Sequence, residues 1–564
     1  MRKQSIKGLA AFAVAGSLLT SCDLMKDLKY TVTPSPLEMH GDSVRVKVDV
    51  TFPEKGIKKK ASAEIIPMLG GIALKPVTVL GEKAVGNGNT IAYKSGGKMV
   101  YTDLIAYQPS FENTRLMVTG KISKGGKVKD EIDPIEIAKG TIITPLLVNK
   151  DFKVVMAEDA FKRTTEQSYT AQINYDKSKS IVKPNELKDA DIKALESWLV
   201  NAQSNVKIAI KNVSITGFAS PEGEQGTNES LSLERSNTAK EAAKGIAKKA
   251  KNTKGQEEIY STVGSGEDWE GFKTELSKSN MKQDEKDLVV RVLEMYKDPV
   301  QREQEIRNMA KTFTFLEQNI LPRLRRSEIR VIYDLTGFSD EELTNMSQKM
   351  IDSLDLEEIL FTATLTSDLN EKLRLYNEAS RLFPTDNRSF NNAGAVLFMQ
   401  GKMDEAKAKF EAANSLEENA ISQNNLGAVA GVKGDRLKAK ELLAKGGGSP
   451  EAKYNLGIIA IQDGVYATAV SNLGDNNFNK ALAQLLNGDV AGAVKTIDAS
   501  TVDKESAQGS YLKAIAAARQ DKLDLTVSNL KKAISKDKNF KAKAAKDMEF
   551  LKYLENPTFI GAMN

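Results

Sequence analysis

The chain contains very little cysteine, histidine and tryptophan: one, one and two residues, respectively, among 564. A single His40 and a single Cys22 cannot form a zinc site of cysteine and histidine ligands, a disulfide or a Cys–His catalytic pair. We interpret His40 as a turn residue. An excess of charge of one sign is also lacking, because 80 Lys and Arg face 75 Asp and Glu. Binding to nucleic acid is therefore not expected.

The sequence also lacks the usual signatures of catalysis. It shows no nucleophile–base pair and no carboxylate pair with a supporting context. The glycine-rich stretches Gly70-Gly71 and Gly446-Gly447-Gly448 lack the strand–loop–helix context that a phosphate-binding loop needs. We predict a non-enzymatic protein without metal or cofactor. Its length and its 41% hydrophobic residues suit about three or four folded domains.

Long hydrophobic runs are absent, since none reaches the roughly 20 apolar residues that span a bilayer. A shorter apolar segment, Leu9 to Leu19, follows the basic residues Arg2, Lys3 and Lys7. This pattern predicts a secretory signal peptide over residues 1–21.

The signal peptide ends in Leu19-Thr20-Ser21-Cys22, which resembles a bacterial lipobox. The resemblance implies that Cys22 becomes the first residue of the mature protein and carries acyl chains such as palmitate. Buried acyl chains anchor a protein stably to a membrane, with each CH₂ contributing about 0.8 kcal/mol. Residues 22–29 then form a lipid-anchored tether. An ordinary signal peptide with an unrelated cysteine is the alternative.

Residues 30–165 have the pattern of a β domain. Val44, Val46, Val48 and Val50 alternate with polar residues, and this period of two indicates a strand with one buried face. Similar short runs follow, separated by turn signals such as Gly125-Gly126. We predict an antiparallel β-sandwich that serves as a scaffold, with carbohydrate binding as the alternative.

Residues 166–340 alternate between strand and helix patterns. We predict strands at 170–175, 206–210, 214–217 and 327–333 and helices at 189–203 and 233–250. The pattern favours an α/β sandwich with helices on one face of a mixed sheet. A helical insertion is expected at about 252–320.

One segment of this region carries a specific motif. It reads Gly217-Phe-Ala-Ser-Pro-Glu-Gly223, then Asn228, Leu231-Ser232 and Arg235. Its spacing resembles the peptidoglycan-binding signature of the OmpA-like domain. The Leu321–Arg326 run lies where that family carries arginines. The long insertion and the form of the loop resemble OmpA-family proteins of the Bacteroidetes.

The resemblance implies binding to the diaminopimelate of the peptidoglycan peptide stem, a zwitterion with an ammonium and a carboxylate. Arg235 matches the family arginine that meets the carboxylate, and a guanidinium offers two parallel donors for that task. It is expected about one turn into its helix. Asn228 and the nearby backbone N–H groups at the helix start would complete the carboxylate pocket. The resemblance also includes Gly217 among the peptidoglycan-binding residues.

The acidic half of the family motif is altered, because Ser220 stands where the family has the aspartate that binds the ammonium. Three interpretations follow. Ser220 or Glu222 compensates and the domain still binds peptide stems; the domain binds another wall element or a protein; or it is structural, with Arg235 only packed or ion-paired.

Residues 350–545 repeat with the spacing of tetratricopeptide (TPR) units. The copies place small residues, turn glycines and aromatic or aliphatic residues at matching positions, as in Gly394, Gly401, Ala406 and Phe410. We predict an all-α TPR solenoid with two shortened units, after Leu443 and after Leu473, and a cap and tail at 546–564. The concave surface of such a solenoid suits a protein partner.

Together these features predict a lipoprotein of the outer membrane that faces the periplasm. It would tether the membrane to peptidoglycan without a covalent bond, while the repeats scaffold an unidentified protein partner. Two other functions stay open: a surface-exposed accessory subunit of an uptake or adhesion complex, and a periplasmic assembly factor.

Overall fold

The computed structural model describes residues 24–26, 28–254 and 259–563. Internal contacts divide the chain into two units, Met1–Glu158 with Thr366–Asn564, and Asp159–Leu365. We call them unit 1 and unit 2. The predicted signal peptide and Cys22 lie outside the described residues. No helix among the described residues is both long and apolar enough to cross a membrane.

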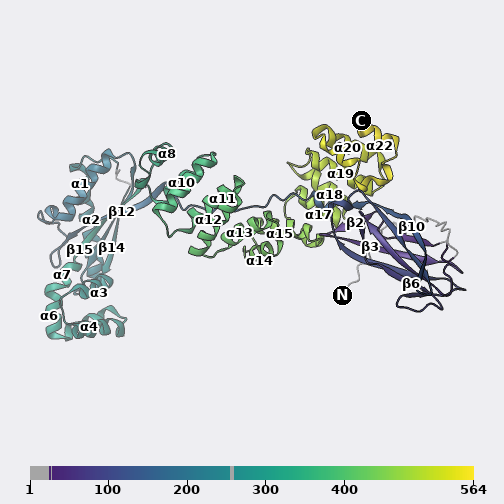
Figure 1. Ribbon diagram of the computed structural model, residues 1–564. Coiled ribbons are helices and arrows are strands. Elements are labelled where there is room, and N and C mark those ends of the chain that lie inside the picture. The colour runs from purple at the N-terminus through teal and green to yellow at the C-terminus, as the bar shows by residue number, and fades with distance from the viewer. Residues whose placement is uncertain (1–23, 27, 255–258, 564) are drawn as a thin grey trace. The chain divides into compact units, whose positions relative to one another are not determined.

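The N-terminal part of unit 1 is a sandwich of two sheets (Figure 1). Side chains from both sheets, such as Val46 and Val118, share one hydrophobic core. The predicted sandwich is confirmed, but it is not wholly antiparallel, because β2 pairs with β11 and β6 with β7 in parallel. The first sheet contains β1 (Lys29–Val32), β2 (Leu37–His40), β3 (Ser43–Phe52), β8 (Gly97–Ala106) and β11 (Thr141–Ile142), and the second β4 (Ala61–Leu69), β5 (Ile72–Ala73), β6 (Val77–Gly81), β7 (Asn89–Ile91), β9 (Arg115–Lys124) and β10 (Lys127–Lys139).

The C-terminal part of unit 1 is a solenoid of helical hairpins, as the repeat spacing predicts. Its helices are α10 (Leu369–Leu382), α11 (Asn387–Met399), α12 (Met403–Leu416), α13 (Ala420–Val432), α14 (Arg436–Ala444), α15 (Pro450–Gln462), α16 (Tyr466–Asn472), α17 (Phe478–Leu486), α18 (Val490–Ala499), α19 (Ala507–Arg519) and α20 (Leu523–Lys536). The turn glycine Gly401 has a φ of 77°, a conformation that side chains disfavour. A Cβ on Gly394 would lie 2.7 Å from the ring of Phe410, so the small residue lets the paired helices approach.

Two features depart from a uniform solenoid. Helices α14 and α16 are short, with 9 and 7 residues, in agreement with the two predicted shortened units. The chain end was expected to form a capping helix and tail. Helix α21 (Asn539–Ala544) precedes this segment, which itself forms a 3₁₀ helix at Met548–Tyr553 and α22 (Pro557–Met563). Phe550 and Phe559 join the core of the last repeats, as a cap does, and α22 stands where the tail was expected.

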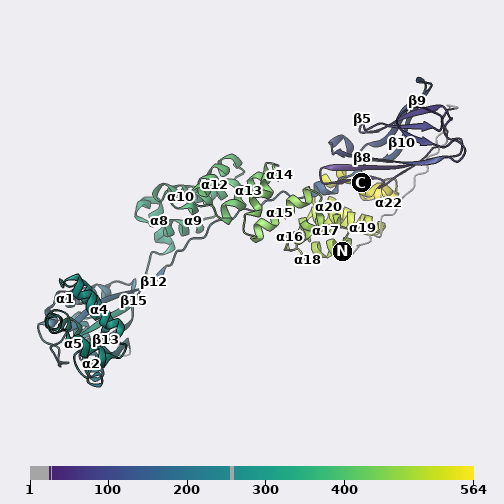
Figure 2. The ribbon, with the colours of Figure 1, turned by 90° about the horizontal axis from the view of Figure 1, so that it is seen from below.

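Unit 2 is built on a four-stranded sheet in the order β12-β15-β13-β14. The strands are β12 (Thr164–Asn174), β13 (Ile208–Ala219), β14 (Tyr260–Glu267) and β15 (Arg326–Thr336). Helices α1 (Ala190–Ser204) and α2 (Gln225–Lys249) pack on the sheet through one apolar core (Figure 2). Only β13 and β14 are parallel, so the predicted mixed sheet is confirmed.

Three sequence predictions for unit 2 were wrong. The two strands expected at 206–210 and 214–217 are one strand, β13. The expected helical insertion contains β14, which pairs along β13. Helix α2 begins at Gln225 instead of near residue 233, so Arg235 lies about three turns into the helix instead of one.

The rest of the insertion is helical and has its own core, which includes Phe272, Val289 and Leu316. Its helices are α3 (Trp269–Lys278), α4 (Gln283–Met295), α5 (Pro299–Asn308), α6 (Ala310–Asn319) and α7 (Leu321–Leu324). After β15, α8 (Asp340–Lys349) and α9 (Leu356–Thr364) complete unit 2.

Candidate functional site

The motif segment joins the end of β13 to α2, and a close approach of the two elements requires Gly217. A Cβ at this position would lie 2.0 Å from the carbonyl oxygen of Ser232 on α2. The helix therefore rests directly on the strand, and the loop between them, residues 220–224, stands at the edge of the sheet.

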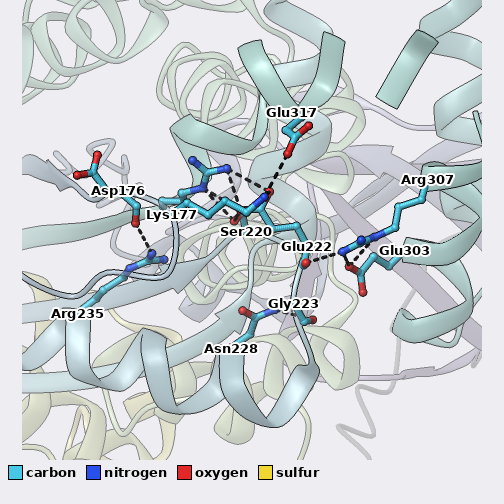
Figure 3. Close-up of polar contacts among 11 residues, drawn as sticks. Asp176, Lys177, Ser220, Glu222, Gly223, Asn228, Arg235, Glu303, Arg307 and Glu317 are labelled. Carbon is cyan, nitrogen blue, oxygen red and sulfur yellow. Dashed lines mark hydrogen bonds and ion pairs between the residues drawn. The ribbon is translucent and has the colours of Figure 1, made fainter. Parts of the chain in front are cut away.

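The Arg235 side chain is buried, with 1% of its surface exposed. Its guanidinium donates three hydrogen bonds to backbone carbonyls: Nε to Lys179 (2.9 Å), Nη1 to Phe218 (2.8 Å) and Nη2 to Asp176 (3.2 Å). Figure 3 shows the bond to Asp176. Burial lowers the pKa of Arg235 to about 10, so it stays charged at neutral pH. Its direct role in the structure is to join the 176–179 loop to the end of β13.

Glu222 forms a buried ion pair with Arg325, 103 residues further along the chain. The nearest atoms, Nη2 and Oε1, are 2.8 Å apart, and the two side chains are 9% and 8% exposed. Ser220 Oγ donates to Glu222 Oε1 over 2.9 Å and accepts from Arg325 Nε over 3.3 Å. The carboxylate expected to replace the family aspartate is therefore paired with an arginine of the chain itself.

Asn228 closes the loop instead of pointing to an open pocket. Its Nδ2 donates to the Gly223 carbonyl and to Glu267 Oε1, each over 3.0 Å, and its side chain is buried. Burial raises the pKa of Glu267, which lies at the end of β14. The predicted pocket residue thus links the motif loop to a strand that the sequence pattern did not indicate.

A cavity of about 210 Å³ lies between the loop and α2. Its wall carries both signs of charge: Lys177 and Arg235 are basic, and Glu222 and Glu234 are acidic. The hydroxyls of Ser178, Ser220, Thr227 and Ser230 and the residues Gly223, Asn228 and Leu231 complete the lining. Of the two carboxylates, Glu234 makes no ion pair within the described residues; it accepts a bond from Ser180 Oγ over 3.1 Å. The cavity can accommodate a small polar group of either sign or a zwitterion.

The insertion adds a second wall beside the motif loop. A neighbouring cavity of about 560 Å³ is lined by Glu222, Gly223 and Glu267 and by residues of α5. Arg307 of α5 donates to the Glu222 carbonyl over 2.5 Å, and Lys177 lies 3.1 Å from Glu317 of α6 (Figure 3). The insertion helices therefore contact both the motif loop and the 176–179 loop.

Sequence reasoning placed Gly217, Ser220, Glu222, Asn228 and Arg235 in one site. The last four line one cavity, whereas Gly217 lies outside its lining and packs against α2. Sequence reasoning did not identify Arg325, although the Leu321–Arg326 run carried the signal, nor Glu234, which the motif spacing leaves unassigned. In the described part of the chain, no three His, Cys, Asp or Glu side chains group as a metal site.

Comparisons with known proteins give only distant similarity. No protein family model and no curated protein matches the chain. Among solved structures, it is similar to a chain of the anaphase-promoting-complex hetero-tetramer Cut9–Hcn1 (13% identity, TM-score 0.32, 39% of this chain and 45% of that one). It is also similar to a tetratricopeptide repeat protein from Parabacteroides merdae (17%, TM-score 0.28, 40% and 91%) and to the TPR protein YrrB (21%, TM-score 0.23, 37% and 100%). The chain thus spans less than half of the first of these, and the low TM-scores support no functional argument.

Proposed function

We propose that this protein is a lipoprotein of the outer membrane that tethers the membrane to peptidoglycan without a covalent bond. In this proposal Cys22 carries the lipid, unit 2 binds the wall on the periplasmic side, and the helical repeats hold a protein partner. The lipobox-like Leu19–Cys22 sequence supports the anchor. The observation that carries wall binding is the small cavity at the motif, whose wall combines Arg235 and Lys177 with Glu234.

The ligand in this proposal is the zwitterionic end of diaminopimelate in a peptide stem. Its carboxylate would lie near Lys177 and Arg235, because three of the five N–H groups of Arg235 are already used by backbone carbonyls and two are left. Its ammonium needs a carboxylate that no arginine neutralises. Glu222 is paired with Arg325, so we assign this role to Glu234.

The position of Glu234 explains how the site can function with a serine at position 220. A charge-assisted hydrogen bond is roughly twice as strong as a neutral one, so Ser220 alone would be a weak replacement for aspartate. Glu234 comes from the helix that also supplies Arg235, and both line the same cavity. The acidic half of the site would thus come from α2 instead of the loop.

Cosedimentation with purified peptidoglycan sacculi tests this assignment, using the full mature chain with Cys22→Ser to keep it free of lipid. The chain should pellet with sacculi, and Glu234→Gln should weaken the affinity for sacculi at least about tenfold, the loss expected for one charged hydrogen bond of about 1.5–3 kcal/mol. Glu229→Gln is the matched control, since Glu229 lies on the same helix, outside the cavity. Equal retention of Glu234→Gln and the control would remove Glu234 from the site.

A further inference from the structure

An extended segment of the chain occupies the groove of the solenoid. Residues 149–157, which we call the strap, follow the β-sandwich and precede unit 2, and they form neither helix nor strand. The strap runs along helices α11, α13, α15 and α17, which are the first helices of successive hairpins (Figures 1 and 2). The surface that the sequence analysis assigned to a protein partner is therefore already occupied.

Four asparagines hold the strap, one from each of these helices. Each accepts a hydrogen bond from a strap backbone N–H through Oδ1 and donates one through Nδ2 to the carbonyl of the same residue. The eight bonds measure 2.7–2.9 Å. The pairs are Asn479 with Asn149, Asn455 with Lys153, Asn425 with Val155, and Asn392 with Ala157.

The four asparagines occupy one position of the repeat. Each stands two residues before the small residue of its first helix, namely Gly394, Gly427, Gly457 or Ala481. A second pair, Asn391 and Asn424, donates to the carbonyls of Val155 and Lys153 and bonds to the first set. All six side chains are exposed by 3% or less. The repeats thus build a continuous row of amides that matches the spacing of an extended backbone.

The side chains of the strap fix its register. Phe152 is buried, and a Cβ on Gly431 of α13 would lie 2.4 Å from its ring. Val154 and Met156 pack on the apolar core of the first repeats, while Lys153 is exposed. The asparagines bind mainly the strap backbone, and Asn479 also donates to the Asp151 carboxylate over 3.3 Å. The space above Gly431 accommodates an aromatic ring at one position.

We propose that the concave groove of the solenoid is a backbone-binding groove whose ligand is the strap of the same chain, and that a protein partner binds outside this groove. Removal of the strap would take away the hydrogen bonds that all six buried amides make to its backbone, and each buried polar group left unpaired costs about 1–3 kcal/mol. The strap is also continuous with folded structure, which gives it an effective concentration on the order of millimolar or more. A free peptide at micromolar concentration does not displace such a ligand.

The proposal does not depend on wall binding, and hydrogen exchange with residue-level fragmentation tests it in the full mature chain carrying Cys22→Ser. The amides of Lys153, Val155 and Ala157 should exchange at least about a hundredfold more slowly than those of Val154 and Met156, which donate to none of the asparagines. Asn392→Ala should release chiefly the amide of Ala157, and Asn455→Ala chiefly that of Lys153. Asn487→Ala is the matched control, since this asparagine is exposed at the end of α17.

Three results would overturn the proposal. Fast exchange of all strap amides in the unmodified groove would mean that it is open in solution. Unchanged protection of the strap in both single variants, with helical circular dichroism retained, would mean that the asparagines do not hold the strap. A dimer by light scattering whose strap protection falls on dilution would identify a second copy as the donor of the strap.

Discussion

At the scale of single residues, Arg235 shows that a motif position proposed to bind a ligand also has a structural role. Its three bonds to backbone carbonyls fix the loop that forms the cavity. Loss of binding in an Arg235 variant is therefore informative only when folding is measured beside it.

We predict that Arg235→Ala lowers the melting temperature of unit 2 by about 5–10 °C, since it leaves buried carbonyls unpaired at a cost of a few kcal/mol. Thermal unfolding of the full chain followed by circular dichroism measures this. Arg235→Lys should recover part of the loss, because one ammonium can still donate to some of the three carbonyls. An unchanged melting temperature in Arg235→Ala would mean that these bonds do not stabilise unit 2.

A second prediction concerns the acidic half of the motif. Ser220→Asp alone would place a carboxylate beside Glu222, since their oxygens are 2.9 Å apart in the wild type, and should weaken folding. The double variant Ser220→Asp, Glu222→Gln keeps one carboxylate near Arg325 and should melt close to the wild type. Melting curves of the three chains decide this, and a stable single variant would contradict the ion-pair account.

Asp547 gives a pH-dependent prediction. Burial raises its pKa to about 6, and Tyr511 donates a hydrogen bond to it over 2.6 Å. Because the pKa is raised in the folded state, its contribution to stability is present at low pH and is lost as pH rises through about 6. Relative to Asp547→Asn, the wild type should gain about 1 kcal/mol between pH 7 and pH 5. Denaturant unfolding at the two pH values checks this, and a difference of zero or the opposite sign would contradict it.

At the scale of elements, the contact between β13 and α2 depends on the glycine at position 217, which has no side chain. We predict that Gly217→Ala severely destabilises unit 2, because the new Cβ would meet the Ser232 carbonyl at 2.0 Å. Gly245→Ala on the same helix has open space around it and should stabilise α2 by up to about 1 kcal/mol. The same thermal scan measures both. Similar effects of the two substitutions would mean that the close approach is not tight.

The elements were predictable where the pattern is local. In β3 every second residue from Val44 to Val50 is a buried valine, and in the hairpins small residues and glycines recur at fixed positions. Both patterns can be recognised within a short stretch of sequence. Strand β14 was missed because its sequence, Tyr260-Ser-Thr-Val-Gly-Ser-Gly-Glu267, is polar and owes its conformation to pairing with β13.

The site was predictable only in part for the same reason. Motif spacing grouped its residues, but the Glu222–Arg325 pair joins positions 103 residues apart, which no local pattern reveals. The strap contacts did leave a signal: an asparagine two residues before the small residue in four consecutive repeats. This signal alone does not predict the contact, because asparagine is common on helix surfaces. The sequence does not show that residues 149–157 lie against these asparagines.

At the scale of the whole molecule, the sandwich and the solenoid form one unit although 207 residues of unit 2, from 159 to 365, separate them in sequence. The strap is one connection within unit 1. Another joins Thr144 of the sandwich to Glu549, which also pairs with Arg519 of α19. Unit 2 is thus inserted in the sequence of unit 1. The chain enters it directly after the strap, whose last residue, Ala157, is bound by Asn392.

The central claim is that unit 2 binds the diaminopimelate end of a peptide stem. The most direct test is competition in the sacculus assay with two soluble tripeptides, one containing diaminopimelate and one with lysine in its place, which lacks only the side-chain carboxylate. We predict that the diaminopimelate peptide releases the Cys22→Ser chain from sacculi and that the lysine peptide does so at least about tenfold less effectively. Absence of the chain from the pellet, or equal release by the two peptides, would contradict the claim.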